Sequence, residues 1–336
     1  MIKKMLKEKI PIGLKSAIVY LFATVFTRGL AIITTPIFTR IMPADQVGMV
    51  NLYSSWYSMI TVVSTLALTS GGFSIALREF EKERNQYVSS VLSLTSIVAI
   101  ILGIIYAIAP SFWNGITGLP THLMVLLIIG LLVAPARDFW LSRQRYEYRY
   151  KLSGMVTTFS AVVASSLAVG AVLYANHIGI SDIASVRLFA NYSIIYGVAL
   201  IIWFSILLRG RCFYSAKYWK FSLQLSLPLI GYSIASQILS VSDRLMISKM
   251  VNNAAVGVYS TLYTVSSLSL MVWTAINASF EPYLYQNMEN SKSKIKKLSM
   301  TMLGMYSLVA ILLVYLAPEI VKILATAEYY KGIYIM

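Results

Sequence analysis

The residue best placed to do chemistry in this sequence is Arg28, which lies in the middle of a long apolar stretch, residues 16–39. A charge near the centre of a bilayer costs about 2.5–3.5 kcal/mol on insertion scales, so such a residue normally faces a protein interior or an aqueous cavity. Helical spacing places Thr24 and Thr35 on roughly the same face as Arg28. Two interpretations follow: Arg28 contacts an anion inside a cavity, or it bonds to carbonyls of neighbouring helices.

A second polar stripe runs along the apolar stretch at residues 221–242 and continues just beyond it. Its members recur at i, i+4, i+7 and i+11, and they are Ser233, Gln237, Ser240 and Arg244, with Asp243 alongside. We take Gln237, Asp243 and Arg244 as candidate cavity residues, together with Asn277 in the following stretch. The alternatives are polar residues that join helices to one another and, for Asp243 and Arg244, a solvated boundary pair.

Aromatic residues in two further stretches are candidates for contacts with sugars, because aromatic rings can stack on sugar rings. They are Tyr53, Trp56, Tyr263 and Trp273. Tyr and Trp also form the aromatic belts at membrane interfaces, which is the competing interpretation.

The remaining motifs point away from cofactor chemistry. The sequence has no Gly-rich ATP-binding loop and no Gly-x-Ser-x-Gly elbow. His122 and His177 stand alone, without a second metal ligand at a suitable spacing. A single cysteine, Cys212, cannot form an internal disulfide. We expect no cofactor, no metal and no enzymatic activity.

The elements that must position these residues are membrane-spanning helices. The chain of 336 residues is 58% hydrophobic and 12% charged, whereas soluble domains have about 45–50% apolar and about 25% charged residues. Spanning the ~30 Å hydrocarbon core takes about 20 apolar residues in a helix. Nine stretches reach that length, and eight of them lack any Asp, Glu, Lys or Arg. They are residues 16–39, 48–71, 87–109, 113–136, 152–176, 188–208, 221–242, 250–280 and 298–318, and a tenth begins near Tyr329.

The net charge of +15 is explained by membrane topology rather than by nucleic-acid binding. Of the 28 Lys and Arg residues, 21 fall in the tail and in alternate loops that share one side of the predicted membrane. Basic residues accumulate in cytoplasmic loops. The chain is therefore predicted to be an all-α polytopic membrane protein whose N-terminus, with a tail at residues 1–15, is cytoplasmic.

An internal repeat divides the predicted helices into two halves. Arg40 and Gly48 recur as Lys249 and Gly257 at an offset of 209, and Pro110 recurs as Pro318 at an offset of 208. Because the period covers six spans, both halves share one orientation, as in transporters built from parallel repeats. We predict an N-terminal bundle at residues 16–210 and a C-terminal bundle at residues 211–336. A complete second repeat would end near residue 417, roughly eighty residues beyond this sequence, so we expect the second bundle to be truncated.

These residues resemble the Wzx-type polysaccharide flippases of the multidrug/oligosaccharidyl-lipid/polysaccharide exporter superfamily. The resemblance spans essentially the whole chain. It is carried by Gly13-Leu14 leading to Arg28, by Pro43-Ala44-Asp45-Gln46-Val47-Gly48, by Asp243-Arg244-Leu245-Met246-Ile247 leading to Ala255-Val256-Gly257-Val258-Tyr259, and by Ala317-Pro318-Glu319 followed by Glu328-Tyr329.

The resemblance implies two parallel six-helix, MATE-like bundles around a central cavity in the bacterial cytoplasmic membrane. It implies transport of an undecaprenyl-pyrophosphate-linked oligosaccharide to the outer leaflet by alternating access, for O-antigen or capsule biosynthesis. Arg28 would be the leading phosphate contact, with Arg244, Gln237 and Asn277 as weaker candidates. Further candidate partners are the lipid bilayer, a coupling ion (H⁺ or Na⁺), a polysaccharide polymerase and a chain-length regulator.

Three other functions remain open at this stage. An ion-coupled multidrug exporter of the same superfamily would need carboxylates inside its helices, and none of the nine predicted spans contains one. A membrane polysaccharide polymerase or ligase would need a large external loop, whereas the predicted outer loops are short. A purely structural scaffold would leave Arg28 and the repeat unexplained.

Overall fold

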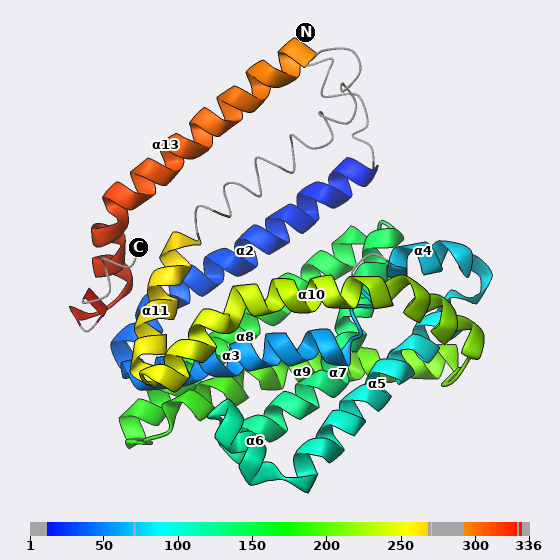
Figure 1. Cartoon of the computed structure of the whole chain (residues 1–336), viewed down its shortest axis with the longest axis horizontal. Helices are drawn as coiled ribbons and strands as arrows, with labels where there is room; N and C mark the ends of the chain where they lie inside the picture. The colour runs from blue at the N-terminus through cyan, green and yellow to red at the C-terminus, as the bar shows by residue number, and fades with distance from the viewer. Residues whose placement is uncertain (1–11, 70–71, 268–269, 271–291, 328, 331–336) are drawn as a thin grey trace.

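The computed structural model describes residues 12–69, 72–267, 270, 292–327 and 329–330 (Figure 1). These residues form eleven α-helices and one 3-10 helix, with no strand among them. In chain order the elements are α2 (Ile12–Ile41), α3 (Ala44–Ser64), α4 (Gly72–Glu79), η1 (Glu81–Glu83), α5 (Arg84–Ile108), α6 (Pro110–Thr117), α7 (Thr121–Tyr146), α8 (Tyr150–Ile178), α9 (Ile183–Gly210), α10 (Ala216–Met250), α11 (Asn253–Ser266) and α13 (Lys292–Leu324).

Seven helices of the described residues are long and apolar enough to cross a membrane: α2, α5, α7, α8, α9, α10 and α13. They coincide with seven of the nine predicted spans, and the all-helical prediction is confirmed. The second predicted span corresponds to α3, which is shorter and ends at Ser64. For the eighth, α11 covers residues 253–266, and most of the remainder lies outside the described residues, as does most of the predicted tenth span.

Helix boundaries correct the sequence prediction at the fourth span, which we expected to begin at residue 113. The structure places a short helix, α6, before a break and starts α7 only at Thr121. Gly118 ends α6 in the left-handed region at φ 70°, and Pro120 caps the start of α7. A left-handed glycine closes a helix, and proline interrupts the hydrogen-bond ladder. A purely apolar count does not detect this break.

The helices α2, α3, α5, α7, α8 and α9 pack together, and we call this group the first bundle (Figure 1). Its largest core cluster gathers large apolar side chains of α3, α7 and α9, among them Leu52, Leu123, Leu127, Leu131 and Leu188. Helix α10 packs along α3, and α13 stands apart from the bundle except at its C-terminal end. There, Thr39 Oγ1 donates to Leu324 O at 2.7 Å and Arg40 Nη2 donates to Ile323 O at 3.1 Å.

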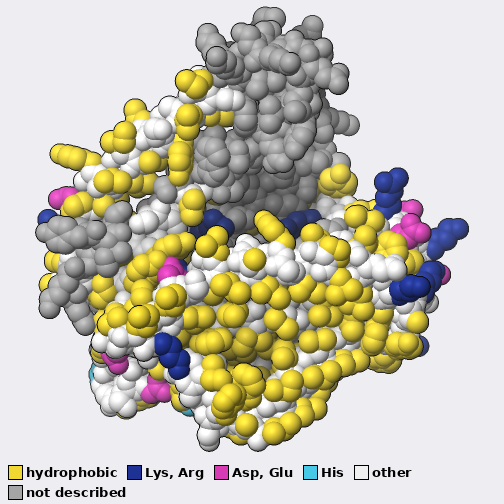
Figure 2. Space-filling view, in the orientation of Figure 1, with side chains coloured by type: hydrophobic (Ala, Val, Ile, Leu, Met, Phe, Trp, Pro, Cys, Tyr) yellow, Lys and Arg dark blue, Asp and Glu magenta, His cyan; other side chains and the backbone are white. Residues whose placement is uncertain are grey.

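Three of the charged loops of the first bundle gather at one end. At one end, which we call the basic end, η1, the α7–α8 junction and the end of α9 come together. At the opposite end, Gln46 of α3 accepts a hydrogen bond from the backbone N–H of Ala184 at 3.0 Å. Figure 2 shows basic side chains, with some acidic ones, gathered near α4, a broad hydrophobic surface across the middle of the visible body, and scattered charged side chains beyond it. Loops that the sequence assigns to one side of the membrane therefore lie together.

Helices α3 and α11 cross at the opposite end with their backbones in close contact. A Cβ built on Gly48 would lie 1.7 Å from Asn253 O, and one built on Gly257 would lie 2.2 Å from Ala44 O. Gly48 and Gly257 are 209 residues apart, as are Ala44 and Asn253. The contact is therefore reciprocal at the same offset as the sequence repeat, and only glycine fits on either side.

Candidate functional site

The polar residues at the end of α10 form a cluster with two tyrosines of α11, and we call Asp243, Arg244, Tyr259 and Tyr263 the α10–α11 cluster. Asp243 Oδ1 accepts the backbone N–H of Arg244 at 2.8 Å, and its Oδ2 accepts the hydroxyl of Tyr259. The guanidinium carbon of Arg244 lies 4.5 Å from the ring centre of Tyr263. The structure thus brings together three residues that the sequence singled out, Asp243, Arg244 and Tyr263.

The Arg244 guanidinium retains donors for a ligand. Its Nη1 donates to Ser240 O, one turn earlier on α10, at 2.9 Å. No ion pair of the described residues includes Arg244, because Asp243 bonds to its backbone rather than to its side chain. A guanidinium carries five N–H donors in a planar fork that matches phosphate and carboxylate oxygens. This cluster can therefore bind an anion while the Tyr263 ring stacks on the cation.

Arg28 lies on a different face of α2 from the one that packs in the first bundle. Its side chain is exposed, and within the described part of the chain it forms no ion pair or side-chain hydrogen bond. Ile32, one turn later and on nearly the same face, packs against the apolar cluster that α11 and α13 share with Ala44. Arg28 consequently projects on the side of α2 that faces the second half of the chain.

The other sequence candidates have different surroundings. Tyr53 is fully buried in the first bundle, where its hydroxyl lies 3.2 Å from that of Tyr196. Trp56 donates from its indole nitrogen to Thr117 O at 2.9 Å. Neither of these aromatic candidates joins the α10–α11 cluster. Gln237 lies half-buried on α10, two turns before Arg244, whereas Trp273 and Asn277 lie outside the described residues.

At least three candidate spanning helices include a carboxylate that the predicted spans left out, one of them Glu319 of α13. Asp138 lies within α7 and Asp243 within α10, because both helices continue beyond the limits that we assigned from the sequence. Both helices are candidate membrane spans over their full length. The prediction that the interiors of the nine spans lack carboxylates concerned shorter segments, and the helices that contain these segments extend beyond them to Asp138 and Asp243.

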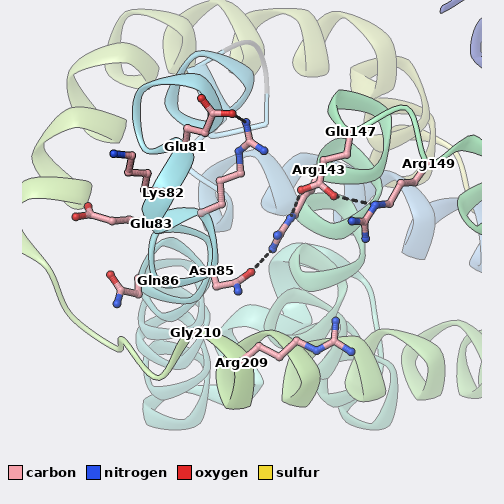
Figure 3. A pocket seen from close by; sticks show the side chains of 11 residues that line it. Glu81, Lys82, Glu83, Asn85, Gln86, Arg143, Glu147, Arg149, Arg209 and Gly210 are labelled. Carbon is pink, nitrogen blue, oxygen red and sulfur yellow. Dashed lines mark hydrogen bonds and ion pairs between the residues drawn. The ribbon is translucent and has the colours of Figure 1, made fainter. Parts of the chain in front are cut away.

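A basic pocket of about 660 Å³ opens at the basic end of the first bundle, and the sequence analysis missed it (Figure 3). Arg143 lies at its centre, with Nε 2.8 Å from Glu147 Oε1 and Nη1 2.7 Å from Asn85 Oδ1. Arg149 pairs with the other oxygen of Glu147 at 3.2 Å. The sequence signal was the accumulation of arginine in alternate loops, which we had explained by topology alone.

Arg209 adds an exposed guanidinium to this pocket, and no ion pair of the described residues includes it. Its position is fixed by the next residue, Gly210, because a Cβ there would lie 2.3 Å from Asn85 O. Figure 3 shows Lys82 and Glu83 pointing away from Arg143 and Arg209. The inner wall of the pocket is therefore cationic.

Comparisons with known proteins agree with this architecture. A family model described as polysaccharide biosynthesis protein matches residues 14–288. A solved structure of the inward-facing conformation of a multidrug resistance MATE family transporter of the MOP superfamily is similar to the chain, with a TM-score of 0.59 and 16% identity. The similarity covers 92% of this chain and 75% of that chain, and at this identity it establishes the fold alone. A search of curated proteins found no match.

Proposed function

Because the chain belongs to the polysaccharide biosynthesis protein family, we propose that it is a flippase for lipid-linked oligosaccharides. Its MATE-like, multi-pass helical fold is that of a transporter rather than of an enzyme with a soluble catalytic domain. The proposed substrate is an undecaprenyl-pyrophosphate-linked repeat unit, moved from the cytoplasmic to the outer leaflet of a bacterial membrane for O-antigen or capsule synthesis. The basic end is the proposed cytoplasmic side.

The observation that carries this proposal is Arg28, which is exposed on a candidate membrane-spanning helix and has no ion pair among the described residues. Sugars and a pyrophosphate cannot cross hydrocarbon, because removing their polar and charged groups from water is too costly. A guanidinium compensates the diphosphate charge by charge-assisted hydrogen bonds while the lipid tail stays in the bilayer. Arg28 supplies that group from the first half of the chain.

The second half supplies complementary groups in the α10–α11 cluster. Arg244 can take part of the diphosphate charge, and Tyr263 offers an exposed ring for a sugar. Gln237 adds an uncharged hydrogen-bonding group two turns away on α10. Trp273 and Asn277 stay in the proposal as sequence candidates, as do coupling to H⁺ or Na⁺ and partnership with a polymerase and a chain-length regulator.

The basic pocket is the proposed first contact of the headgroup on the cytoplasmic side. Arg209 lies there without an acidic partner, and Arg143 and Arg149 share a single glutamate, Glu147. Movement between the two sides would occur by rocking of the halves about the α3–α11 crossing, where Gly48 and Gly257 permit close contact.

Complementation tests the proposal directly. The gene would be expressed in a strain that lacks its own flippase for the corresponding repeat unit, and surface polysaccharide would be measured by immunoblot. Arg28→Ala is expected to abolish restoration, and Arg28→Lys to retain part of it, because lysine keeps the charge but not the bidentate geometry. Arg78→Ala is the matched control, since Arg78 is exposed on α4.

The variants must be present in the membrane at wild-type levels, as judged by a fluorescent fusion. Full restoration of surface polysaccharide by Arg28→Ala at such levels would remove Arg28 from the transport path. Failure of the unaltered chain to restore polysaccharide in any flippase-deficient host would contradict the proposed function itself.

One observation favours a second candidate function, an ion-coupled multidrug exporter. Asp243 lies inside a spanning helix and is held by the hydroxyl of Tyr259, an arrangement in which a carboxylate can exchange a proton or a cation. Resistance to cationic drugs on expression, lost in Asp243→Asn and unaccompanied by any polysaccharide phenotype, would favour this exporter over the flippase.

A further inference from the structure

A second arginine, Arg187, lies half-buried in the first bundle, near the start of a candidate spanning helix. It falls in the second turn of α9, where the guanidinium carbon is 3.6 Å from the ring centre of Phe38. Its Nη1 lies 3.8 Å from the sulfur of Met42. Neither neighbour carries a negative charge, and none of the ion pairs within the described residues involves Arg187.

Arg187 lines a partly open cavity of about 270 Å³ between α2, α3, α8 and α9, which we call the first-bundle cavity. No aspartate or glutamate lines it. Asn191 lies one helical turn after Arg187 on the same face of α9 and also lines the cavity. No side-chain hydrogen bond of Asn191 occurs within the described part of the chain, so two neighbouring donor groups point into one space.

The cavity is also lined by the hydroxyl side chains of Thr27, Thr34, Ser54, Ser165 and Tyr192. Thr27 Oγ1 donates to Ala23 O at 2.7 Å, and Ser54 Oγ donates to Val50 O at 2.9 Å. These hydroxyl protons are used within their own helices, and the oxygens present lone pairs that can order water. Positive charge and free N–H donors are therefore concentrated on the α9 side of the cavity.

The charge balance of the cavity indicates the type of ligand. A guanidinium inside a membrane-spanning bundle is costly unless a negative charge or a rich set of hydrogen bonds compensates it. One monovalent anion would neutralise Arg187, whereas a dianion would leave an excess negative charge in the same place. A water molecule occupies about 30 Å³ in the liquid, so the cavity accommodates an ion with several waters but not an oligosaccharide.

We propose that the first-bundle cavity binds one monovalent inorganic anion of chloride size, held between Arg187 and Asn191. This site is separate from the proposed transport path, because Thr27 and Arg28 lie on different faces of α2. The anion neutralises the half-buried arginine and fills the space between α2 and α9. Chloride is thus a structural ligand of the first bundle that does not depend on the identity of the transported substrate.

Equilibrium binding of ³⁶Cl⁻ to the purified full chain in detergent, by scintillation proximity, tests this proposal. We expect saturable binding at about one ion per chain, displaced by bromide but not by gluconate. Arg187→Gln is expected to lower the affinity at least about tenfold and Asn191→Leu by a smaller factor, because charge-assisted hydrogen bonds are the stronger ones. Arg28→Gln and Arg78→Gln should bind chloride as the unaltered chain does.

Thermal unfolding provides the second measurement. Sodium chloride should raise the unfolding temperature relative to sodium gluconate at equal ionic strength, since a ligand that binds only the folded state stabilises it. Equal stabilisation by both salts, absence of saturable ³⁶Cl⁻ binding, or undiminished binding by a folded Arg187→Gln would each overturn the proposal. If Arg187→Gln does not fold, Asn191→Leu decides: weakened binding supports the site, and unchanged binding refutes it. No lipid-linked substrate enters these assays, so their outcome is independent of the flippase proposal.

Discussion

Replacing Gly48 by alanine is the sharpest perturbation that the structure offers. The new Cβ would lie 1.7 Å from Asn253 O, 2.6 Å from Asn253 C and 3.1 Å from Gly257 N. The first two distances involve backbone atoms of α11, so no side-chain rotation can relieve the overlap. Alanine at position 48 must therefore move α3 and α11 apart where they cross.

The size of the effect follows from these distances. Ordinary van der Waals contact begins at 3.4 Å, so the crossing must open by about 1.7 Å around position 48. Overpacking of this kind typically costs about 1–3 kcal/mol, and alanine regains up to about 1 kcal/mol through its higher helix propensity. We expect a net loss of about 1–2 kcal/mol, which favours the open crossing by about 5- to 30-fold.

Two measurements follow the change. Thermal unfolding in detergent should occur at a lower temperature for Gly48→Ala than for the unaltered chain. Spin labels at Phe112 and Met250, in a Cys212→Ser background, report the distance between α6 and the end of α10. Both positions are exposed. Next to them α6 and α10 are in contact, because Lys249 Nζ donates to Gly115 O at 2.5 Å. Double electron–electron resonance should give longer, broader distances in Gly48→Ala.

Matched controls are available in the same chain. Gly29 of α2 and Gly231 of α10 have no atom within 4 Å of a built Cβ. Gly29→Ala and Gly231→Ala should leave the label distances unchanged, with equal or slightly higher unfolding temperatures, because only helix propensity changes. The reasoning is refuted if Gly48→Ala has the same unfolding temperature and the same distance distribution as the unaltered chain.

Three further predictions concern other contacts. Tyr87→Phe removes a 2.9 Å hydrogen bond to the buried Ser222 and should cost about 1–3 kcal/mol in denaturant unfolding; an unchanged midpoint would contradict it. Gly210→Ala would place a Cβ 2.2 Å from a side-chain carbon of α5. This overlap should lower the free energy of unfolding by about 1–3 kcal/mol and the unfolding temperature with it; a melting curve identical to that of the unaltered chain would disprove it. Arg244→Gln should retain the fold but lose complementation, with Tyr263→Phe unaffected because the ring remains; normal polysaccharide with Arg244→Gln would exclude that arginine from the path.

Much of the helical architecture could be predicted because each span is specified locally. A run of about 20 apolar residues is stable across hydrocarbon whatever its neighbours are. The limits of the runs were less predictable. Gly118 and Pro120 break the fourth predicted span, and α10 carries Asp243 and Arg244 beyond the residues that hydropathy assigned to it. A helix can continue through polar residues when a partner such as Tyr259 forms a hydrogen bond with one of their side chains.

The candidate site was predictable only in part. Arg244 and Tyr263 are 19 positions apart in sequence but adjacent in space, because α10 and α11 pack as neighbours. Arg187 showed no signal of its own in the sequence, since a charge near the end of a predicted span resembles an ordinary loop residue. Its significance depends on a cavity that residues of four helices line.

The sequence by itself determined the class of molecule, the positions of most of its helices and the segregation of its basic loops. These properties depend on the transfer of each segment between water and hydrocarbon, which composition measures directly. The tertiary structure decided which face of each helix meets another helix, a cavity or the lipid. Apolar side chains are nearly as stable against lipid as against protein, so hydrophobicity cannot distinguish these surroundings. Close packing and hydrogen bonding do distinguish them, and these place Tyr53 in a core, Gly48 at a helix crossing and Arg187 beside a cavity.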